Sequence, residues 1–101
     1  MAESIIVHVD PDLADLVPGF LDNRRADVVR MGTALDRSDF DPIRIAGHSM
    51  KGSGGGYGFD EITAIGARIE RAALARDAAA VRAEIDALAE YLARVEVVYD
   101  G

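Results

Sequence analysis

The sequence contains no cysteine and has little positive charge. Without thiols, the chain cannot form disulfides or thiolate metal sites. Its 11 Lys and Arg residues are outnumbered by 18 Asp and Glu residues, for a formal net charge of −7. This balance argues against a dedicated nucleic-acid-binding protein, which needs a basic surface. Because no apolar run could span a bilayer and no signal-peptide pattern is present, we expect a cytoplasmic protein that does not bind membranes.

The size and hydrophobicity of the chain point to a single folded unit. With 101 residues, half of them hydrophobic, the chain fits one domain with one packed core. We therefore expect a single domain over residues 1–101, present as a monomer.

Apolar residues recur along most of the chain at the three- and four-residue spacings of an amphipathic helix. The stripes predict one short helix followed by four long ones, over about 11–16, 18–36, 42–57, 60–75 and 78–98. The connections between the long helices are short, so successive helices should be antiparallel neighbours. The predicted fold is therefore all-α, an up-down-up-down antiparallel four-helix bundle with a short additional N-terminal helix.

Proline and aspartate residues support the predicted helix starts. Asp10 and Asp41 each precede a proline, as a capping carboxylate does when proline occupies the first helical position. Pro18 either starts the first long helix or kinks a longer one. Asp60 and Asp77 are further candidate N-caps.

The N-terminal segment does not follow the helical pattern. Residues 5–9, IIVHV, have the β-branched composition of a strand. No other stretch of the chain has the pattern expected of a partner strand. We therefore expect residues 1–10 to form an extended arm packed on the domain.

Residues 47–58, GHSMKGSGGGYG, raise the question of whether so many glycines can lie in a helix. Each helical glycine costs about 1 kcal/mol relative to alanine, and glycine content alone would favour a loop over Ser53–Gly58. The unbroken core-facing stripe through Tyr57 instead predicts helix up to that residue. Gly58 would then take the left-handed conformation beyond the helix end, and Gly54 is a candidate for close packing against a neighbouring helix.

On such a helix His48 faces outward. It lies two residues from the core-facing Met50 and is therefore turned roughly 160° away from it, at about 100° per residue. Lys51 follows at i+3, and Gly52 and Gly55 follow at i+4 and i+7 on the outer face. The exposed stripe thus presents an imidazole, an ammonium group and nearly bare backbone, which would let another macromolecule approach closely.

Several common sites do not fit this segment. A P-loop needs Gly-Lys-Ser/Thr after a strand, and the residues around Lys51 do not match. A dinucleotide fingerprint needs a βαβ unit. Structural zinc is disfavoured because there is no cysteine and His8 is remote in sequence, so no metal site is expected. Ser49 points about 100° away from His48 on a helix, which disfavours a Ser-His-Asp triad.

The remaining chemistry is that of an exposed nucleophilic imidazole beside a lysine. A histidine with the unperturbed pKa of about 6.5 is mostly neutral at pH 7, as a nucleophile must be. A transferred phosphoryl group would bring about two negative charges, which Lys51 could partly offset.

The segment HSMKGSGGGYGF resembles the H-x-x-K-G…G signature of histidine-containing phosphotransfer (HPt) domains. The family fold is a four-helix bundle that carries an exposed, phosphorylatable histidine in its second long helix. VDPDLADLVPGFLDNRRADV resembles the segment leading into the first bundle helix, and ARIERAA resembles the helix after the motif. The resemblance covers nearly the whole chain. Gly47 stands where alanine is frequent, and Met50 replaces a common leucine.

The resemblance implies that His48 accepts the phosphoryl group, that Lys51 stabilises it, and that Gly52 leaves room for a receiver domain. Gly55 and Phe59 are expected in the same docking region. For Phe59 the alternative is a core position at the helix junction.

Glu70 is a further site residue that the resemblance suggests. In phosphotransfer domains of the chemotaxis-kinase type, a glutamate at the matching place orients the histidine through its other ring nitrogen. Glu70 could equally be a surface carboxylate or an ion-pair partner of Arg24, Arg25 or Arg68.

We therefore expect a phosphocarrier of a two-component phosphorelay rather than an enzyme with its own ATP site. It would accept the phosphoryl group from a phosphoaspartyl receiver domain of a response regulator and pass it to another receiver. Mg²⁺ is expected on the receiver, and no cofactor on this chain. Two alternatives remain open: direct phosphorylation by an ATP-dependent histidine kinase, and a non-catalytic helical adaptor that docks a partner on the glycine patch.

Overall fold

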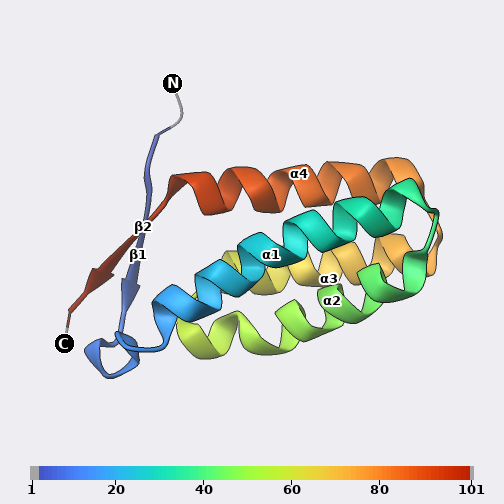
Figure 1. Ribbon diagram of the computed structural model, residues 1–101. Helices are drawn as coiled ribbons and strands as arrows, with labels where there is room; N and C mark the ends of the chain where they lie inside the picture. Colours follow the sequence, from blue (N-terminus) through green and yellow to red (C-terminus); the bar gives the residue numbers. More distant parts are fainter. Residues whose placement is uncertain (1–2, 101) are drawn as a thin grey trace.

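The computed structural model describes residues 3–100, in which four long helices pack side by side (Figure 1). They are α1 (Val17–Asp36), α2 (Phe40–Ser53), α3 (Asp60–Leu74) and α4 (Ala78–Arg94). Consecutive helices run in opposite directions, so the predicted up-down-up-down bundle is confirmed. Residues 1, 2 and 101 of the expected domain, and with them the start of the expected arm, lie outside the described residues. No helix within residues 3–100 is long and apolar enough to cross a membrane.

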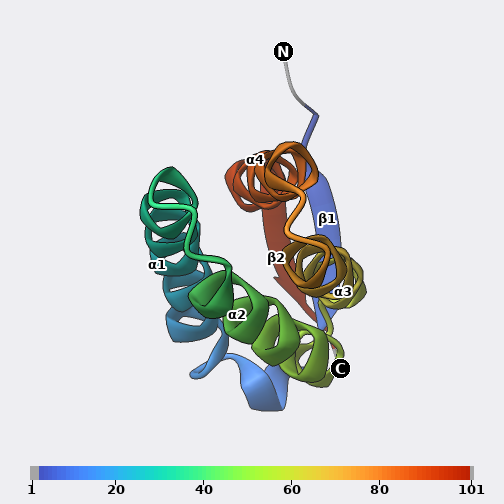
Figure 2. The same cartoon turned by 90° about the vertical axis from the view of Figure 1, so that its right-hand side faces the viewer.

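The core lies on the common axis of the four helices, which Figure 2 shows end-on. The predicted stripes meet there, because each helix turns its apolar side toward the other three. The side chains that are almost fully buried include Met31, Ile43, Met50, Ile62, Ile65, Ile69, Val81, Ile85 and Leu88.

The turns between α1 and α2 and between α3 and α4 are built alike. Ser38 and Arg76 have φ angles of 55° and 53°, which end α1 and α3 in the left-handed conformation. The amide of the next residue, Asp39 or Asp77, then bonds back into the preceding helix, as in a Schellman turn. The Asp77 side chain caps α4 by accepting from the amide of Ala80 at 3.0 Å, as predicted.

Asp41 does not cap a helix, contrary to the prediction. Helix α2 begins at Phe40, so Pro42 lies in its first turn. Amide groups in the first turn have no acceptor within the helix, so the missing N–H of proline costs no hydrogen bond there. The prediction for Pro18 is resolved in favour of a helix start, because α1 begins at Val17.

The N-terminal strand has a partner, so the expectation of an unpaired arm is wrong. Strand β1 (Ile5–Val9) pairs in parallel with β2 (Val95–Tyr99), in the register Ile5 to Val95 through Val9 to Tyr99. The two strands cross one end of the bundle (Figure 1). The fold is therefore a helical bundle with a small parallel sheet rather than purely all-α.

The last helix ends at Arg94, four residues before its predicted end at 98. The apolar spacing was misleading here, because Val95 and Tyr99 are four residues apart. That separation places two side chains on one side of a helix and also on one face of a strand. The β-branched run around Val97 forms a strand, and its backbone groups pair with β1.

The short helix expected over 11–16 is also absent. Residues Pro11–Leu13 form a single 3-10 turn, η1. Asp10 caps this turn by accepting from the amide of Asp12 at 2.9 Å. One turn suffices to redirect the chain from β1 into α1, whose first residue is Val17.

Helices α2 and α3 approach so closely that their backbones touch at two glycines. A Cβ atom placed on Gly66 would lie 2.6 Å from the Lys51 amide nitrogen and 2.8 Å from the Gly47 carbonyl oxygen. A Cβ atom on Gly47 would lie 2.7 Å from the Glu70 amide nitrogen. Real side chains do not make contacts this short, so both positions require glycine at this helix separation.

We expect Gly66→Ala to lower the free energy of unfolding by about 1–3 kcal/mol, because the added methyl group must push α2 and α3 apart. Urea unfolding monitored by circular dichroism measures this change. Gly19→Ala is the matched control, since a Cβ atom on Gly19 in α1 would meet nothing within 4 Å. The control should be neutral or stabilising by up to about 1 kcal/mol. Equal stability of the Gly66→Ala variant and the parent would contradict the close approach.

Candidate functional site

His48 lies on the outer face of α2, as predicted, with 68% of its side chain exposed. The adjacent Gly47 and Met50 are buried against α3 and the core, which fixes the direction in which the imidazole projects. The ring nitrogen Nδ1 lies 2.7 Å from Oε2 of Glu70.

Glu70 reaches this position from α3, and its side chain is only 17% exposed. Its second oxygen, Oε1, accepts a hydrogen bond of 2.8 Å from Nζ of Lys51. One carboxylate therefore holds the side chains of both His48 and Lys51 on α2, and it can do so because the glycine contact brings the two helices together. Glu70 therefore contacts His48, rather than being a free surface carboxylate or the partner of an arginine.

The three arginines suggested as partners of Glu70 are engaged elsewhere. Nε of Arg24 lies 2.9 Å from a carboxylate oxygen of Asp27, and Arg25 bonds Asp22 within the same helix. Arg68 donates to Glu84 on α4 at 2.9 Å.

The contact with Glu70 determines which ring nitrogen of His48 can react. An ionised carboxylate only accepts hydrogen bonds, so Nδ1 must carry the proton that it donates to Oε2. In the neutral imidazole, Nε2 then keeps a free lone pair. Because the ring is anchored through Nδ1, the nitrogen with a free lone pair is the one that does not contact the carboxylate.

The hydrogen bond from Lys51 and, second, the hydrogen bond from His48 lower the pKa of Glu70 below its ordinary value of 4.5. The carboxylate is therefore ionised throughout the neutral range. This keeps it available as an acceptor for the imidazole and for the ammonium group at the same time.

The surface next to His48 is open at Gly52. A Cβ atom on Gly52 would meet no atom within 4 Å, so the space above this turn is unoccupied by the protein itself. The prediction of an exposed glycine one turn from His48 is confirmed.

Gly55 does not lie on the outward stripe of α2. The helix ends at Ser53, earlier than the predicted residue 57, and Gly55–Tyr57 form a 3-10 turn, η2. The amide of Gly55 donates to Oγ1 of Thr63 at 2.8 Å, which turns the chain toward α3. Gly58 has a φ angle of 91°, so its predicted left-handed conformation is confirmed.

The early end of α2 follows from a second close contact. A Cβ atom on Gly54 would lie 2.6 Å from the amide nitrogen of Thr63 and 2.9 Å from the Phe59 carbonyl oxygen. The predicted packing role of Gly54 is therefore confirmed. The amide of Phe59 also bonds the Gly54 carbonyl at 2.8 Å, which folds the glycine run back onto the start of α3.

Phe59 is a core residue, so its expected contribution to a docking surface is wrong. Its side chain is 0% exposed, and its ring stacks on that of Phe20 with centroids 5.6 Å apart. Phe20 also stacks on Tyr57 at 4.4 Å. These three rings fasten the glycine-rich turn to α1.

Sequence reasoning missed Gly66 as a determinant of the site. Gly47 stood out only as a departure from the usual alanine. The sequence did contain a hint of the close contact, because each of the two neighbouring predicted helices carries one of these glycines. Across residues 3–100, no group of three or more His, Cys, Asp or Glu side chains is placed to hold a metal ion.

We expect Glu70→Gln to destabilise the protein in a pH-dependent manner. Because the folded-state pKa of Glu70 is lowered, its carboxylate contributes stability that is fully present above the unfolded pKa and is lost as the pH falls through the folded pKa. The gap in unfolding free energy between parent and variant should therefore be largest near pH 7 and shrink below about pH 4. Urea titrations across this range, with the exposed Glu96→Gln as control, measure the gap. A gap that stays constant down to about pH 3 would contradict the ionic role of Glu70.

Comparison with known families agrees with this geometry. The model of the Hpt domain family matches residues 15–97, a span that contains all four helices and the His48, Lys51 and Glu70 cluster. Searches among curated proteins and among solved structures gave no match. Hpt domains are phosphocarriers that work with histidine kinases and response regulators in phosphorelays. Since the match spans most of its length, the chain belongs to the Hpt domain family.

Proposed function

We propose that His48 is the residue that carries the phosphoryl group, and that it does so on Nε2. The observation that carries this proposal is the 2.7 Å contact between Nδ1 and Glu70 on an imidazole that is otherwise largely exposed. This contact keeps the proton on Nδ1 and leaves the lone pair of Nε2 free. The second histidine, His8, makes a similar contact of 2.6 Å between Nδ1 and Asp100, but only the carboxylate at His48 also bonds a lysine, Lys51.

The donor in this proposal is the phosphoaspartate of a receiver domain. The lone pair of Nε2 attacks phosphorus in line, the N–P bond forms, and the O–P bond of the acyl phosphate breaks to release the aspartate carboxylate on the receiver. The ring then bears a positive charge, which the ionised Glu70 stabilises through the Nδ1–H hydrogen bond. Transfer to a second receiver reverses these steps.

Lys51 supplies positive charge one helical turn from the acceptor. Its ammonium group lies 2.8 Å from Oε1 of Glu70, and 44% of its side chain is exposed. A phosphoryl group on His48 would add about two negative charges nearby. Lys51 can turn toward this group and partly neutralise it, while Mg²⁺ is expected on the receiver.

Direct phosphorylation by the ATP-binding domain of a histidine kinase is the alternative source of the phosphoryl group. The free Nε2 serves either donor equally well. A purely adaptor role would use the open surface at Gly52 without chemistry at His48.

We expect His48→Gln to abolish acid-labile, base-stable phosphorylation by phosphorylated receivers and by ATP-charged kinases, because His8, the other histidine, has a similar contact with a carboxylate but no lysine beside it. Circular dichroism should show unchanged helicity, since the side chain is exposed. His8→Gln is the matched control and should label as the parent does. Undiminished labelling of the His48→Gln variant would exclude His48 as the acceptor, and labelling of the parent by neither donor would favour the adaptor role.

We expect Gly52→Gln to block transfer from receivers while leaving stability unchanged or raised, because glutamine is a good helix former and its side chain would occupy the open surface. Gly32→Gln on α1 is the control, since a Cβ atom there meets only the tip of the Arg82 side chain, at 3.9 Å. Phosphoramidate, a small donor, should still label His48 in both variants. Receiver-dependent labelling at the parental rate in Gly52→Gln would contradict the docking role.

A further inference from the structure

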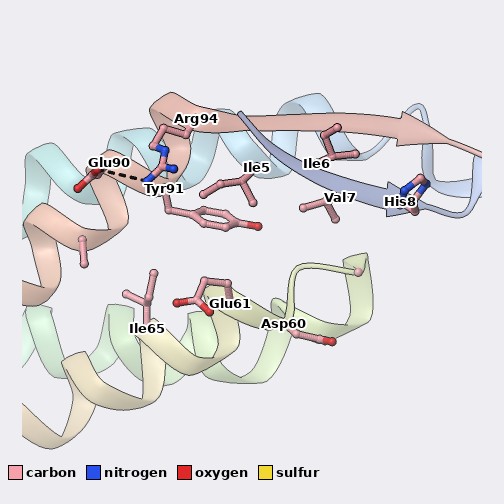
Figure 3. Close-up of a pocket in the computed structure, with 12 residues that line it drawn as sticks. Ile5, Ile6, Val7, His8, Asp60, Glu61, Ile65, Glu90, Tyr91 and Arg94 are labelled. Carbon is pink, nitrogen blue, oxygen red and sulfur yellow. Dashed lines mark hydrogen bonds and ion pairs between the residues drawn. The ribbon is translucent and has the colours of Figure 1, made fainter. Parts of the chain in front are cut away.

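A second candidate site lies at the end of the bundle that carries the sheet. A cavity of about 550 Å³ opens between strand β1, the first turns of α3 and the last turns of α4 (Figure 3). Its apolar wall includes Ile5, Val7 and Ile65, and its polar groups include Tyr91 and Glu61. No residue of the His48 cluster lines it.

Tyr91 presents its hydroxyl group to this cavity. The residue is only 5% exposed, and its hydroxyl has no hydrogen-bond partner among residues 3–100. Figure 3 shows the ring between Ile5 and Glu61, with the hydroxyl directed into the open space. Burial, and after it the charges of Glu61 and Asp60, raises the pKa of Tyr91 to about 12. The hydroxyl is therefore protonated, and it remains open to a hydrogen-bond partner that enters the cavity.

The polar side chains around the cavity are predominantly acidic. Asp60, Glu61 and Glu90 line it, and Arg94 is the one Lys or Arg residue among its described lining. Arg94 lies 3.4 Å from Glu90, so its charge is already matched. Among the described residues, the one ion pair of Glu61 is the 3.7 Å contact with Arg68. The excess of carboxylates favours a cationic occupant.

The backbone of β1 supplies a third recognition element. The amide of Asp100 donates to the Val9 carbonyl at 3.3 Å, so the backbone groups of Val9 point toward β2. In a parallel ladder alternate residues point the same way, which turns the N–H and C=O groups of Ile6 and His8 to the other edge. The sheet has only two strands in the described chain, so that edge has no partner strand.

This free edge borders the cavity. All four residues from Ile5 to His8 contribute to its lining. The His8 carbonyl oxygen lies 3.8 Å from the position of a Cβ atom on Gly58, which narrows the groove at that end. An incoming strand can therefore pair best around Ile6, beside the hydroxyl of Tyr91.

We propose that this groove is a docking site for an extended peptide segment of a partner protein. The segment adds as a strand to the free edge of β1 and inserts one Lys or Arg side chain between Tyr91 and Glu61. Main-chain pairing supplies affinity in such strand addition, and the pocket for an alternate side chain supplies specificity. The unpaired edge favours a peptide over a small cation, because only a peptide can pair with Ile6.

The groove lies away from the His48 site. Glu61 and Glu70 are nine residues apart on α3, a separation of about 13 Å along the axis and about 180° around it. The two carboxylates therefore project from opposite sides of the same helix. Occupation of the groove leaves His48 accessible, so the protein can hold one partner while it exchanges a phosphoryl group with another.

The test is an NMR titration of ¹⁵N-labelled protein with a capped peptide of alternating Thr and Val that carries one central Arg. We expect shifts at the amides of Ile6, His8 and Glu61, and the same shifts in His48→Gln. Tyr91→Phe and Glu61→Gln should each weaken binding about tenfold, since each removes a hydrogen bond to a charged group. Glu96→Gln is the matched control: it removes one charge from the opposite face of the sheet and should bind as the parent does.

Two further probes separate the proposed peptide from other occupants. A peptide with Glu in place of Arg, and an Arg peptide with N-methyl groups on its alternate amides, should not bind. The proposal is overturned if the Arg peptide causes no shifts at these amides, if either modified peptide binds as well, or if butylguanidinium alone binds as tightly as the Arg peptide. The last result would indicate a small-cation site instead. Because the readout is binding and not phosphorylation, the test is independent of the role of His48.

Discussion

The architecture of the site depends on the contact between the backbones of α2 and α3 at Gly47 and Gly66. A Cβ atom at either position would lie 2.6–2.9 Å from atoms of the facing helix, so a side chain there would force the helices apart. At the observed separation, the short reach of a glutamate side chain is enough to bring the Glu70 carboxylate to both His48 and Lys51.

The same carboxylate divides the chemistry between the two nitrogens of the imidazole. Nδ1 is committed to Glu70 and holds the proton, while Nε2 is free to react. The hydrogen bonds from Lys51 and His48 lower the pKa of Glu70 further below the neutral range, so its carboxylate stays an acceptor for both side chains. The open surface at Gly52 complements this arrangement, since the proposed transfer requires a second protein to reach bonding distance of the imidazole. In the proposed function, the cost of glycine in the helix is offset by access for a partner.

Much of this could be predicted from the sequence, because the helices follow from apolar spacing and the turns from residues with strong local preferences. The outward direction of His48 followed from its position relative to Met50. The second strand could not be predicted this way, because the spacing of Val95 and Tyr99 fits a helix and a strand equally. The role of Glu70 also stayed open, since a contact between two helices depends on how closely their axes approach, and that distance is visible only in three dimensions.

The central claim is that Glu70 holds Nδ1 and leaves Nε2 as the nucleophile. The most direct test is heteronuclear NMR of the phosphorylated protein with ¹⁵N-labelled histidine, which identifies the nitrogen of His48 that bears phosphorus through its coupling to ³¹P. The account predicts phosphorus on Nε2 and a proton on Nδ1 within hydrogen-bonding distance of Glu70. Phosphorus on Nδ1 would contradict it, because that product requires the contact between His48 and Glu70 to be broken.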